Sequence, residues 1–319
     1  MDKPFYLAPM AELSHRALRE LIEGFGGCDA YFSEMISAGA LLAGGQFEKW
    51  YIDSAPKPEK CIFQLVGSDS GVISKAAAVL DELECAGIDI NMGCSAPLIR
   101  KTGAGVTWMS SIDNAAELIY RVRPQVKRRL SVKLRIGLKD DFDYLVRFCR
   151  KLEEEGVELI TLHPRTAAEK FKRLARWDYV GKLKAELKIP VAGNGDILNA
   201  DELVRRAESS CDAVMVGRAA VRHPWIFAQA QELSKEPHAE TQRRREEEGF
   251  NIERIGLRFI ELLAEYQPVE FHISRARRFF GFFCDNLKWG NYLKNKLNRE
   301  ETLSGIENIW CEYFRENDE

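Results

Sequence analysis

The chain has 319 residues, more than one ordinary domain and enough to bury a large core without disulfide bonds or structural metals. Its 45% apolar and 30% charged residues exclude a disordered protein, and its net charge of −3 excludes a uniformly basic nucleic-acid binder while allowing a local basic face. It has neither a leader pattern nor an apolar run near the roughly 20 residues that cross a bilayer, so we expect a cytoplasmic protein that does not contact membranes.

Over the first two thirds of the chain, short apolar runs rich in β-branched and aromatic residues alternate with segments of helical period. The eight expected strands are Phe5–Ala8, Ala30–Glu34, Ile62–Val66, Ile88–Met92, Ser131–Ile136, Leu159–His163, Pro190–Gly193 and Ala213–Gly217. The helices expected between them are Ser14–Phe25, Gly71–Cys85, Ile112–Lys127, Phe142–Glu155, Trp177–Leu187 and Ala200–Ala207. This alternation predicts an α/β fold, either a (β/α)8 TIM barrel or an open doubly wound sheet.

The positions of the polar residues favour the barrel. Residues typical of binding and catalytic sites fall within or directly after nearly every expected strand, from Pro9-Met10 at the first to Gly217-Arg218 at the eighth. In a barrel the carboxyl ends of all the strands meet at one mouth, whereas an open sheet brings together only the strands near its switch point. The sequence therefore predicts one site at the mouth of a barrel.

After Phe227 the strand signals stop. The segment Ser234–Glu248 holds four basic and five acidic residues and almost nothing apolar, which is typical of a solvated linker or an exposed helix. Helical patterns resume at Ile252–Tyr266, Phe271–Phe283 and Tyr292–Leu297. We therefore expect a barrel domain over residues 1–240 and a small all-helical domain over residues 241–319.

The sharpest local motif is Asn91-Met92-Gly93-Cys94, which leaves an apolar strand and opens a loop that contains Pro97 and two glycines. A thiol at a strand end can donate or accept a proton when its surroundings tune its pKa. The eight cysteines form no Cys-x-x-Cys pair and no cluster has metal spacing, so we expect a reduced chain without a metal site. We expect a chemical role for Cys94 and packing roles for most of the others.

Lys133 and Arg135 alternate with apolar residues, which places both basic side chains on one face of their strand. In a barrel that face is the interior, where an unpaired charge is costly. The two cations therefore need an anionic or electron-rich ligand, or else a structural pairing with Asp89 or Glu34.

His163-Pro164-Arg165-Thr166 follows another apolar run, so the histidine and the arginine two residues later can both point into the mouth. Gly193-Asn194-Gly195-Asp196 and Val216-Gly217-Arg218 follow the seventh and eighth strands. Glycines there let backbone N–H groups approach a phosphate, and an arginine completes the cradle at the usual phosphate position of a barrel. These motifs predict a phosphorylated ligand such as flavin mononucleotide (FMN), whose isoalloxazine ring would lie across Lys133 and Gln64.

The helical tail is basic. Residues 268–299 hold seven basic and two acidic residues, and aromatic residues are interleaved with them. Most of the phenylalanines are expected to form the helical core. The basic side chains fit contacts to a nucleic-acid backbone, and an ordinary solvated helical face is the alternative.

Taken in chain order, the motifs resemble the tRNA-dihydrouridine synthases, flavin-dependent enzymes that reduce uridine in tRNA. The resemblance spans essentially the whole chain and rests on Ala8-Pro9-Met10-Ala11, Gln64, Asn91-Met92-Gly93-Cys94, Lys133-Leu134-Arg135, His163-x-Arg165-Thr166, Asn194-Gly195-Asp196, Gly217-Arg218 and Pro224-Trp225-Ile226-Phe227. The chain departs from the family's usual proline, lysine and glycine at Ser95, Leu98 and Pro164.

The resemblance implies specific contacts and a reaction. The residues implied to hold FMN are Pro9, Met10, Ala11, Gln64, Lys133, His163, Asn194, Gly195, Asp196, Gly217 and Arg218. The substrate contacts expected are Asn91, Arg135, Arg165, Arg277 and Arg278. NADPH would reduce FMN, hydride would pass from the flavin N5 to C6 of a uridine flipped out of the tRNA, and Cys94 would protonate C5. A monomer that binds tRNA is expected.

Two other functions are compatible with parts of the sequence. One is a flavin barrel that reduces a small molecule such as a dihydropyrimidine or an enone, and the basic tail argues against it. The other is an RNA-binding module without catalytic activity, and the presence of Cys94, Lys133 and His163 argues against that.

Overall fold

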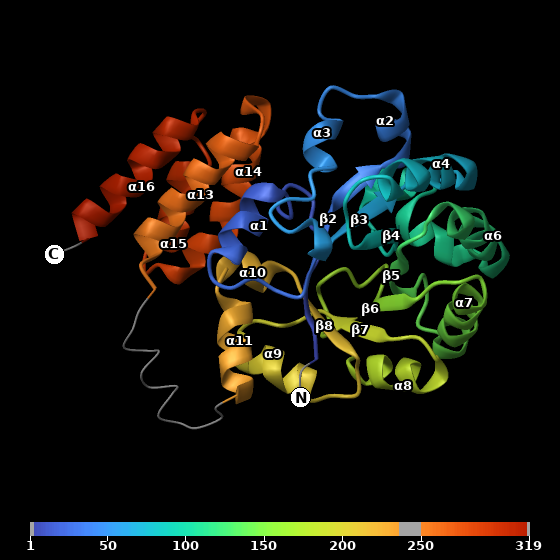
Figure 1. Cartoon of the computed structure of the whole chain (residues 1–319). Coiled ribbons are helices and arrows are strands. Elements are labelled where there is room, and N and C mark those ends of the chain that lie inside the picture. Colours follow the sequence, from blue (N-terminus) through green and yellow to red (C-terminus); the bar gives the residue numbers. More distant parts are fainter. Residues whose placement is uncertain (1–2, 236–249, 318–319) are drawn as a thin grey trace.

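A computed structural model of the chain describes residues 3–235 and 250–317. Its strands close into a parallel barrel in chain order, with β1 paired to β8 (Figure 1). The strands are β1 (Phe5–Leu7), β2 (Ala30–Ser37), β3 (Cys61–Val66), β4 (Gly87–Met92), β5 (Arg129–Gly137), β6 (Leu159–Thr166), β7 (Val191–Asn194) and β8 (Ala213–Val216). The predicted barrel is confirmed, and the closed strand order excludes an open sheet.

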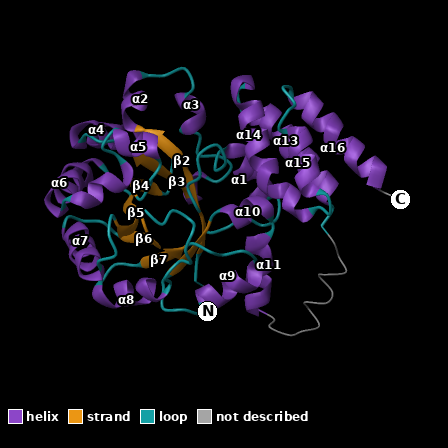
Figure 2. Cartoon of the chain, turned by 180° about the vertical axis from the view of Figure 1, so that it is seen from behind, coloured by secondary structure: helices purple, strands orange, loops and turns teal. Residues whose placement is uncertain are grey.

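Helices surround the strands (Figure 2). Those of the barrel are α1 (Arg16–Glu23), α2 (Ala38–Ala43), α3 (Glu48–Tyr51), α4 (Ser70–Asp81), α5 (Pro97–Lys101), α6 (Ile112–Val122), α7 (Phe142–Glu154), α8 (Asp178–Glu186), α9 (Ala200–Ala207), α10 (Arg218–Arg222) and α11 (Ile226–Lys235). The short 3₁₀ segments are Pro58–Lys60, Gly105–Ser110, Arg123–Gln125 and Cys284–Asn286. Every helix within residues 3–235 and 250–317 is too short or too polar to cross a membrane.

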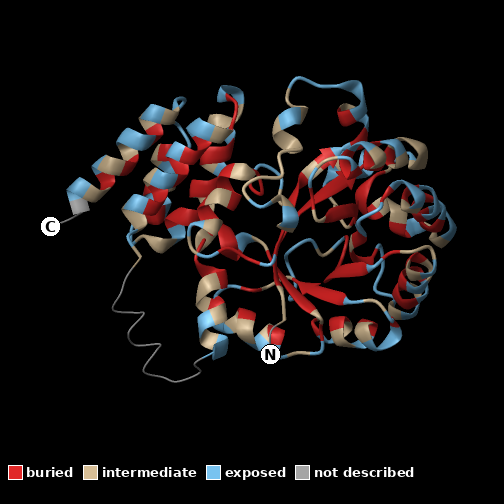
Figure 3. Cartoon of the chain, viewed as in Figure 1, coloured by how far each residue is buried: buried red, intermediate tan, exposed pale blue. Residues whose placement is uncertain are grey.

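The strands are buried along almost their whole length (Figure 3). One end of the barrel interior is filled by an apolar cluster: Tyr6, Ala8, Ala30, Phe32, Ile62, Leu159, Ala192, Ala213 and Met215. Towards the other end the interior becomes polar. The register places Asp89 beside Ser131 and Asn91 beside Lys133, and alternate residues of a strand share a face. The polar end is the mouth at the carboxyl ends of the strands, so the strand register itself builds the site.

In the described part beyond residue 249 the chain is helical, as predicted. The helices are α13 (Ile252–Tyr266), α14 (Val269–Phe283), α15 (Gly290–Leu297) and α16 (Leu303–Asn317). α13 packs on α1 and α14 on α10, so the tail lies against the barrel (Figure 1). Phe279 stacks on Phe259 with ring centroids 3.6 Å apart and on Phe283 at 4.9 Å, which confirms that these phenylalanines form the helical core.

Sequence patterns missed several elements of this fold. The helices α2, α3 and α5 are short and lie in connections without helical periodicity. α16 was missed although Leu303, Ile306, Trp310 and Phe314 recur at helical spacing, a signal that could have found it. The expected domain boundary at residue 240 and most of the charged segment Ser234–Glu248 lie outside the described residues.

Candidate active site

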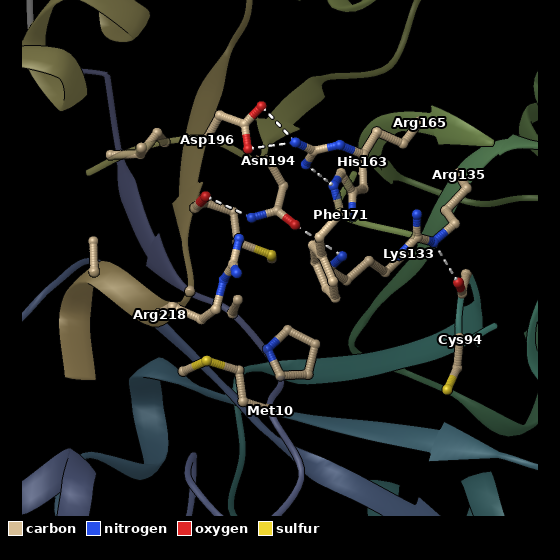
Figure 4. Close-up of a pocket in the computed structure, with 18 of the residues that line it drawn as sticks. Met10, Cys94, Lys133, Arg135, His163, Arg165, Phe171, Asn194, Asp196 and Arg218 are labelled. Carbon is tan, nitrogen blue, oxygen red and sulfur yellow. Dashed lines mark hydrogen bonds and ion pairs between the residues drawn. The ribbon is translucent and has the colours of Figure 1, made fainter. Parts of the chain in front are cut away.

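A cavity of about 340 Å³ opens at the mouth of the barrel (Figure 4). The predicted site residues that line it are Pro9, Met10, Asn91, Cys94, Lys133, Arg135, His163, Arg165, Asn194, Gly195, Asp196, Gly217 and Arg218. Ala11, Gln64, Arg277 and Arg278 lie outside its lining. Among the described residues, Asp196 is the one carboxylate of a lining that holds five lysine and arginine side chains. Such an electropositive cavity attracts an anionic ligand.

Cys94 lies at the edge of this cavity, on the side away from Asp196 and Arg218 (Figure 4). Its backbone N–H donates to Oδ1 of Asn91 at 2.9 Å, which fixes the turn after β4. Gly105 packs against the same turn, because a Cβ there would lie 2.5 Å from the carbonyl oxygen of Cys94. The cysteines are all free, and only Cys94 and Cys311 are not buried among the described residues. The packing role predicted for most of the other cysteines agrees with this burial.

A chain of buried hydrogen bonds inside the barrel fixes the orientation of the Asn91 side chain. Its Nδ2 donates to Oε1 of Gln64 at 2.8 Å, and Nε2 of Gln64 donates to Asp89 at 2.7 Å. Asp89 also accepts from the hydroxyl of Ser131 at 2.6 Å, and burial raises its pKa to about 6. Both polar ends of Gln64 are therefore used within the barrel, and this side chain positions the Cys94 turn.

Lys133 lies at the floor of the cavity and is partly buried. Its Nζ donates to Oδ1 of Asn194 at 3.1 Å, and Nδ2 of Asn194 donates to the carbonyl of Met215 at 2.8 Å. Burial, and then the charge of Arg135, lower the pKa of Lys133 to about 8. A partly buried ammonium with a single amide partner favours an electron-rich ligand in the cavity.

The alternative of a structural ion pair for Lys133 or Arg135 is wrong. Within residues 3–235 and 250–317 neither cation has a carboxylate at ion-pair distance. Glu34 is paired with Arg275 instead, and Asp89 is held by neutral groups.

Arg135 ties two loops of the mouth together. Its Nε donates to the carbonyl of Gly93 at 3.0 Å, next to Cys94, and its Nη1 donates to the carbonyls of Thr166 and Lys170 at 3.3 Å each. A change at Arg135 would therefore disturb the Cys94 turn as well as any ligand contact.

His163 is held as a neutral imidazole. Nη1 of Arg165 lies 3.0 Å from its Nε2, and a guanidinium can only donate, so Nε2 accepts and Nδ1 carries the ring proton. Burial, followed by the surrounding cations, lowers the pKa of His163 well below its ordinary value. His163 can therefore act as a hydrogen-bond donor in the cavity without adding charge.

Arg165 and Asp196 form a buried clamp. Nη2 of Arg165 donates to both carboxylate oxygens of Asp196 at 2.6 Å, and Asp196 also accepts from the backbone N–H of Ala175 at 2.6 Å. Asp196 holds a left-handed backbone with φ of 53°, a conformation that costs a non-glycine residue energy. The clamp fixes the β6–α8 loop on the loop that follows β7.

Sequence reasoning missed Phe171, which projects over the cavity from the β6–α8 loop (Figure 4). Its ring lies 4.5 Å from the guanidinium carbon of Arg218, 5.7 Å from that of Arg135 and 6.0 Å from that of Arg165. It stands between lysines in a segment that has the composition of a solvated loop, so the sequence carried no signal for it. Arg222 and Phe282, which also line the cavity, were missed as well.

Pro9 and Met10 enter the cavity on a tight turn between β1 and α1. The N–H of Met10 donates to Oγ of Ser14 at 2.6 Å. Glu12 has a left-handed φ of 64°, and its N–H donates to Oε1 of Glu34 at 2.6 Å. The buried carboxylate of Glu34 therefore holds this turn in place, while Ala11 is exposed.

Glycines in the loops after β7 and β8 let the backbone lie close to its neighbours at the cavity. Gly195 has φ of 120°, and a Cβ there would lie 3.0 Å from the ring of His163. Gly217 precedes Arg218, whose guanidinium has no hydrogen-bond partner among the described residues. Burial lowers the pKa of Arg218, which further favours an anion beside it.

The two tail arginines predicted to bind substrate lie on α14. Nη2 of Arg277 donates to the carbonyl of Glu300 at 2.7 Å. Arg278 is exposed and lies 3.8 Å from a carboxylate oxygen of Glu12. No cluster of His, Cys, Asp and Glu in the part of the chain that the structure describes could hold a metal ion.

The fold and this cavity define a TIM-barrel protein with an electropositive mouth and a helical tail docked beside it. A family model described as dihydrouridine synthase (Dus) matches residues 6–313, so the chain belongs to that family.

Individual relatives agree with this family. A probable tRNA-dihydrouridine synthase of Aquifex aeolicus is 34% identical over 232 residues, which are 71% of this chain and 72% of that protein. A probable tRNA-dihydrouridine synthase of Rickettsia bellii is 29% identical and covers 88% of this chain and 85% of its own length. The tRNA-dihydrouridine(47) synthase [NAD(P)(+)]-like of Homo sapiens is 29% identical over 71% of this chain and 35% of its own. Among solved structures, a putative lyase/mutase from Burkholderia cenocepacia has a TM-score of 0.44 at 14% identity, over 77% of this chain and 85% of that one.

Proposed function

We propose that this chain is a tRNA-dihydrouridine synthase that reduces specific uridines of tRNA to 5,6-dihydrouridine, with FMN as cofactor and NADPH as electron donor. The observation that carries the proposal is the shared cavity of Cys94, Lys133 and His163 in a member of the Dus family. The relatives' names supply the substrate class. In this proposal the barrel is catalytic, the helical tail binds tRNA, and the chain acts as a cytoplasmic monomer.

The cavity residues fit FMN. The unpartnered guanidinium of Arg218 and the cavity-lining glycines Gly195 and Gly217 suit its phosphate. The ammonium of Lys133 suits the electron-rich N1 and O2 edge of the flavin, and the Nδ1 proton of His163 adds a neutral donor. The chemistry that FMN supplies when bound is hydride transfer from its N5 to C6 of the uracil, after reduction by NADPH.

The chain's own residues then position the uracil and move a proton. A uridine must leave the stacked tRNA before it can enter the cavity. Arg135 and Asn91, which flank the Cys94 turn, are proposed to contact its edge. The Sγ–H bond of Cys94 breaks as its proton passes to C5, and solvent returns a proton to the thiolate. Arg165, Arg277 and Arg278 are proposed as further contacts to the RNA.

The decisive test is made in two steps. The purified protein is examined for a flavin absorbance spectrum, and tRNA from a deletion strain is analysed by mass spectrometry. We expect bound FMN and the loss of dihydrouridine at one or more positions. A purified protein without flavin absorbance would contradict the proposed enzyme and favour an RNA-binding module without catalytic activity. Unchanged tRNA together with bound flavin would indicate a small-molecule substrate.

The lowered pKa of Lys133 gives the cavity a pH dependence. The ammonium loses its proton as the pH rises through about 8, and a neutral amine binds an electron-rich group more weakly. We expect the affinity for FMN to fall about three- to fourfold between pH 7 and pH 9, because a charged hydrogen bond is worth about 1 kcal/mol more than a neutral one and a small charged fraction remains at pH 9. Quenching of flavin fluorescence measures it. The Lys133→Met variant should bind weakly at both pH values, and a similar step in that variant would assign the titration to another group.

A further inference from the structure

The helix α15 presents two large aromatic side chains to solvent. Trp289, directly before the helix, is 57% exposed and Tyr292 is 60% exposed. The helix buries Gly290, Leu293 and Leu297 on its other side, so its packing does not need these two rings. Trp289, Tyr292 and Lys296 follow one another at helical spacing and share one face.

Each of these rings is accompanied by a lysine. Nζ of Lys288 lies 5.7 Å from the ring of Trp289, and Nζ of Lys296 lies 5.2 Å from the ring of Tyr292. Neither lysine has a carboxylate partner in the part of the chain that the structure describes. We call Lys288, Trp289, Tyr292 and Lys296 the α15 face.

Several other cations of the tail have a protein partner. Arg275 is buried in its pair with Glu34, and Arg277 donates to a backbone carbonyl. Lys294 pairs with Asp285, and Arg278 lies near Glu12. Of the cations in residues 250–317 that have no ion-pair partner, Lys288 and Lys296 lie against exposed aromatic rings, whereas Arg254, Arg299 and Arg315 do not.

An ion-pair chain joins α15 to the cavity mouth. Arg222 lines the cavity and pairs with Asp285, and Asp285 pairs in turn with Lys294 of α15. Phe282, one helix turn earlier than Asp285, lines the same cavity. The helix α15 is therefore tied to the rim of the cavity through Lys294, which lies on a different face of the helix from Tyr292 and Lys296.

We propose that the α15 face binds an unpaired nucleotide of the RNA substrate by stacking its base on Trp289 and Tyr292 while Lys288 and Lys296 contact the flanking phosphates. This rests on the proposed function, because it names a second contact for the same tRNA. Exposed aromatic rings interleaved with free cations are the combination that proteins use for single-stranded nucleic acid, since every base has a π-face and every linkage carries a charge.

The shape of the surface suits one base. The rings stand beside a groove of about 390 Å³, whose other side is formed by Ile309, Tyr313 and Glu316 of α16. The apolar floor accepts a ring face. Glu316 lies at the groove as its one carboxylate among the described residues, and it can accept a hydrogen bond from an amino group of a base.

The test measures binding of the full-length protein to a tRNA pool from a strain that lacks dihydrouridine. The Trp289→Ala/Tyr292→Ala variant is expected to bind roughly tenfold or more weakly, as removal of stacking partners does elsewhere. Trp289→Phe/Tyr292→Phe keeps both ring faces and should restore most of the affinity. Tyr120→Ala removes an equally exposed tyrosine, 65% exposed on α6 at the outside of the barrel, and should bind like the wild type.

The contribution of Lys288 and Lys296 is measured separately, from the salt dependence of tRNA binding. Lys288→Gln/Lys296→Gln should reduce the slope of log affinity against log salt by about 1.4, at about 0.7 for each lost phosphate contact to a single strand. Wild-type binding by both double variants would overturn the proposal. A change from dimer to monomer in the alanine variant without loss of tRNA affinity would overturn it too, by making the face a contact between copies of the chain. Failure of the wild type to bind tRNA would refute the proposed function instead.

Discussion

Replacing Cys94 with alanine is expected to lower the rate of dihydrouridine formation by a factor of about 100 or more, the usual contribution of a positioned proton donor. The thiol is at the cavity edge, and the hydrogen bonds that shape its turn go to backbone atoms, so removal of Sγ leaves the turn intact. The rate is measured with excess NADPH and a tRNA pool without dihydrouridine. The flavin absorbance of the same preparation should stay at the wild-type level.

The matched control is Cys311→Ala. Cys311 lies on α16 and is the other cysteine that is not buried among the described residues. Its removal should leave the rate unchanged. A Cys94→Ala variant that reduces tRNA at the wild-type rate would eliminate Cys94 as the proton donor. Loss of bound flavin in that variant would instead show that the Cys94 turn supports the cofactor site.

Most of the fold could be predicted because the barrel strands are buried on both faces. The strand Ala213–Val216 has a continuous apolar signal, and period-two alternation placed Lys133 and Arg135 inside. The residues at the strand ends therefore converged as expected. These residues converge because the carboxyl ends of all strands of a parallel barrel meet at one mouth, which can be predicted from the order of the strands alone.

Contacts between distant segments could not be predicted in the same way. Arg275 stands in a segment rich in basic residues, where the sequence predicts a surface cation. It is instead buried against Glu34, which is 241 positions away. Gln64, within β3, hydrogen-bonds to Asp89 and to Asn91, and no local pattern marks either partner. Such pairings depend on how the tail docks and on the barrel register, neither of which leaves a local pattern in the sequence.

The second large effect is expected when the buried ion pair between Arg275 of the tail and Glu34 of the barrel is broken. Nη2 of Arg275 lies 2.9 Å from Oε2 of Glu34, and their side chains are 2% and 4% exposed. Arg275→Met would leave the Glu34 carboxylate buried without its partner. We expect the free energy of unfolding to fall by about 3–5 kcal/mol, the usual cost of breaking a buried pair by removing one partner. The shift of the urea unfolding midpoint measures it.

The surroundings of the pair make its effect reach the cavity. Glu34 also accepts the N–H of Glu12 in the turn that carries Pro9 and Met10. If the carboxylate moves towards water in Arg275→Met, this turn loses its anchor, and we expect weaker FMN binding at a temperature where the variant is still folded. Arg278→Met breaks an exposed pair with Glu12 at 3.8 Å and should cost below about 1 kcal/mol.

A double variant distinguishes the loss of a charge partner from the loss of side-chain packing. Burial raises the pKa of Glu34 above its ordinary value even with Arg275 beside it, so the pair does not fully offset the cost of desolvation. Glu34→Gln/Arg275→Met removes both charges and keeps an amide oxygen for the N–H of Glu12. We expect it to recover most of the stability that Arg275→Met loses, together with its FMN affinity. A double variant as unstable as the single one would mean that packing of the Arg275 side chain on Phe271, 4.6 Å away, carries the effect rather than charge.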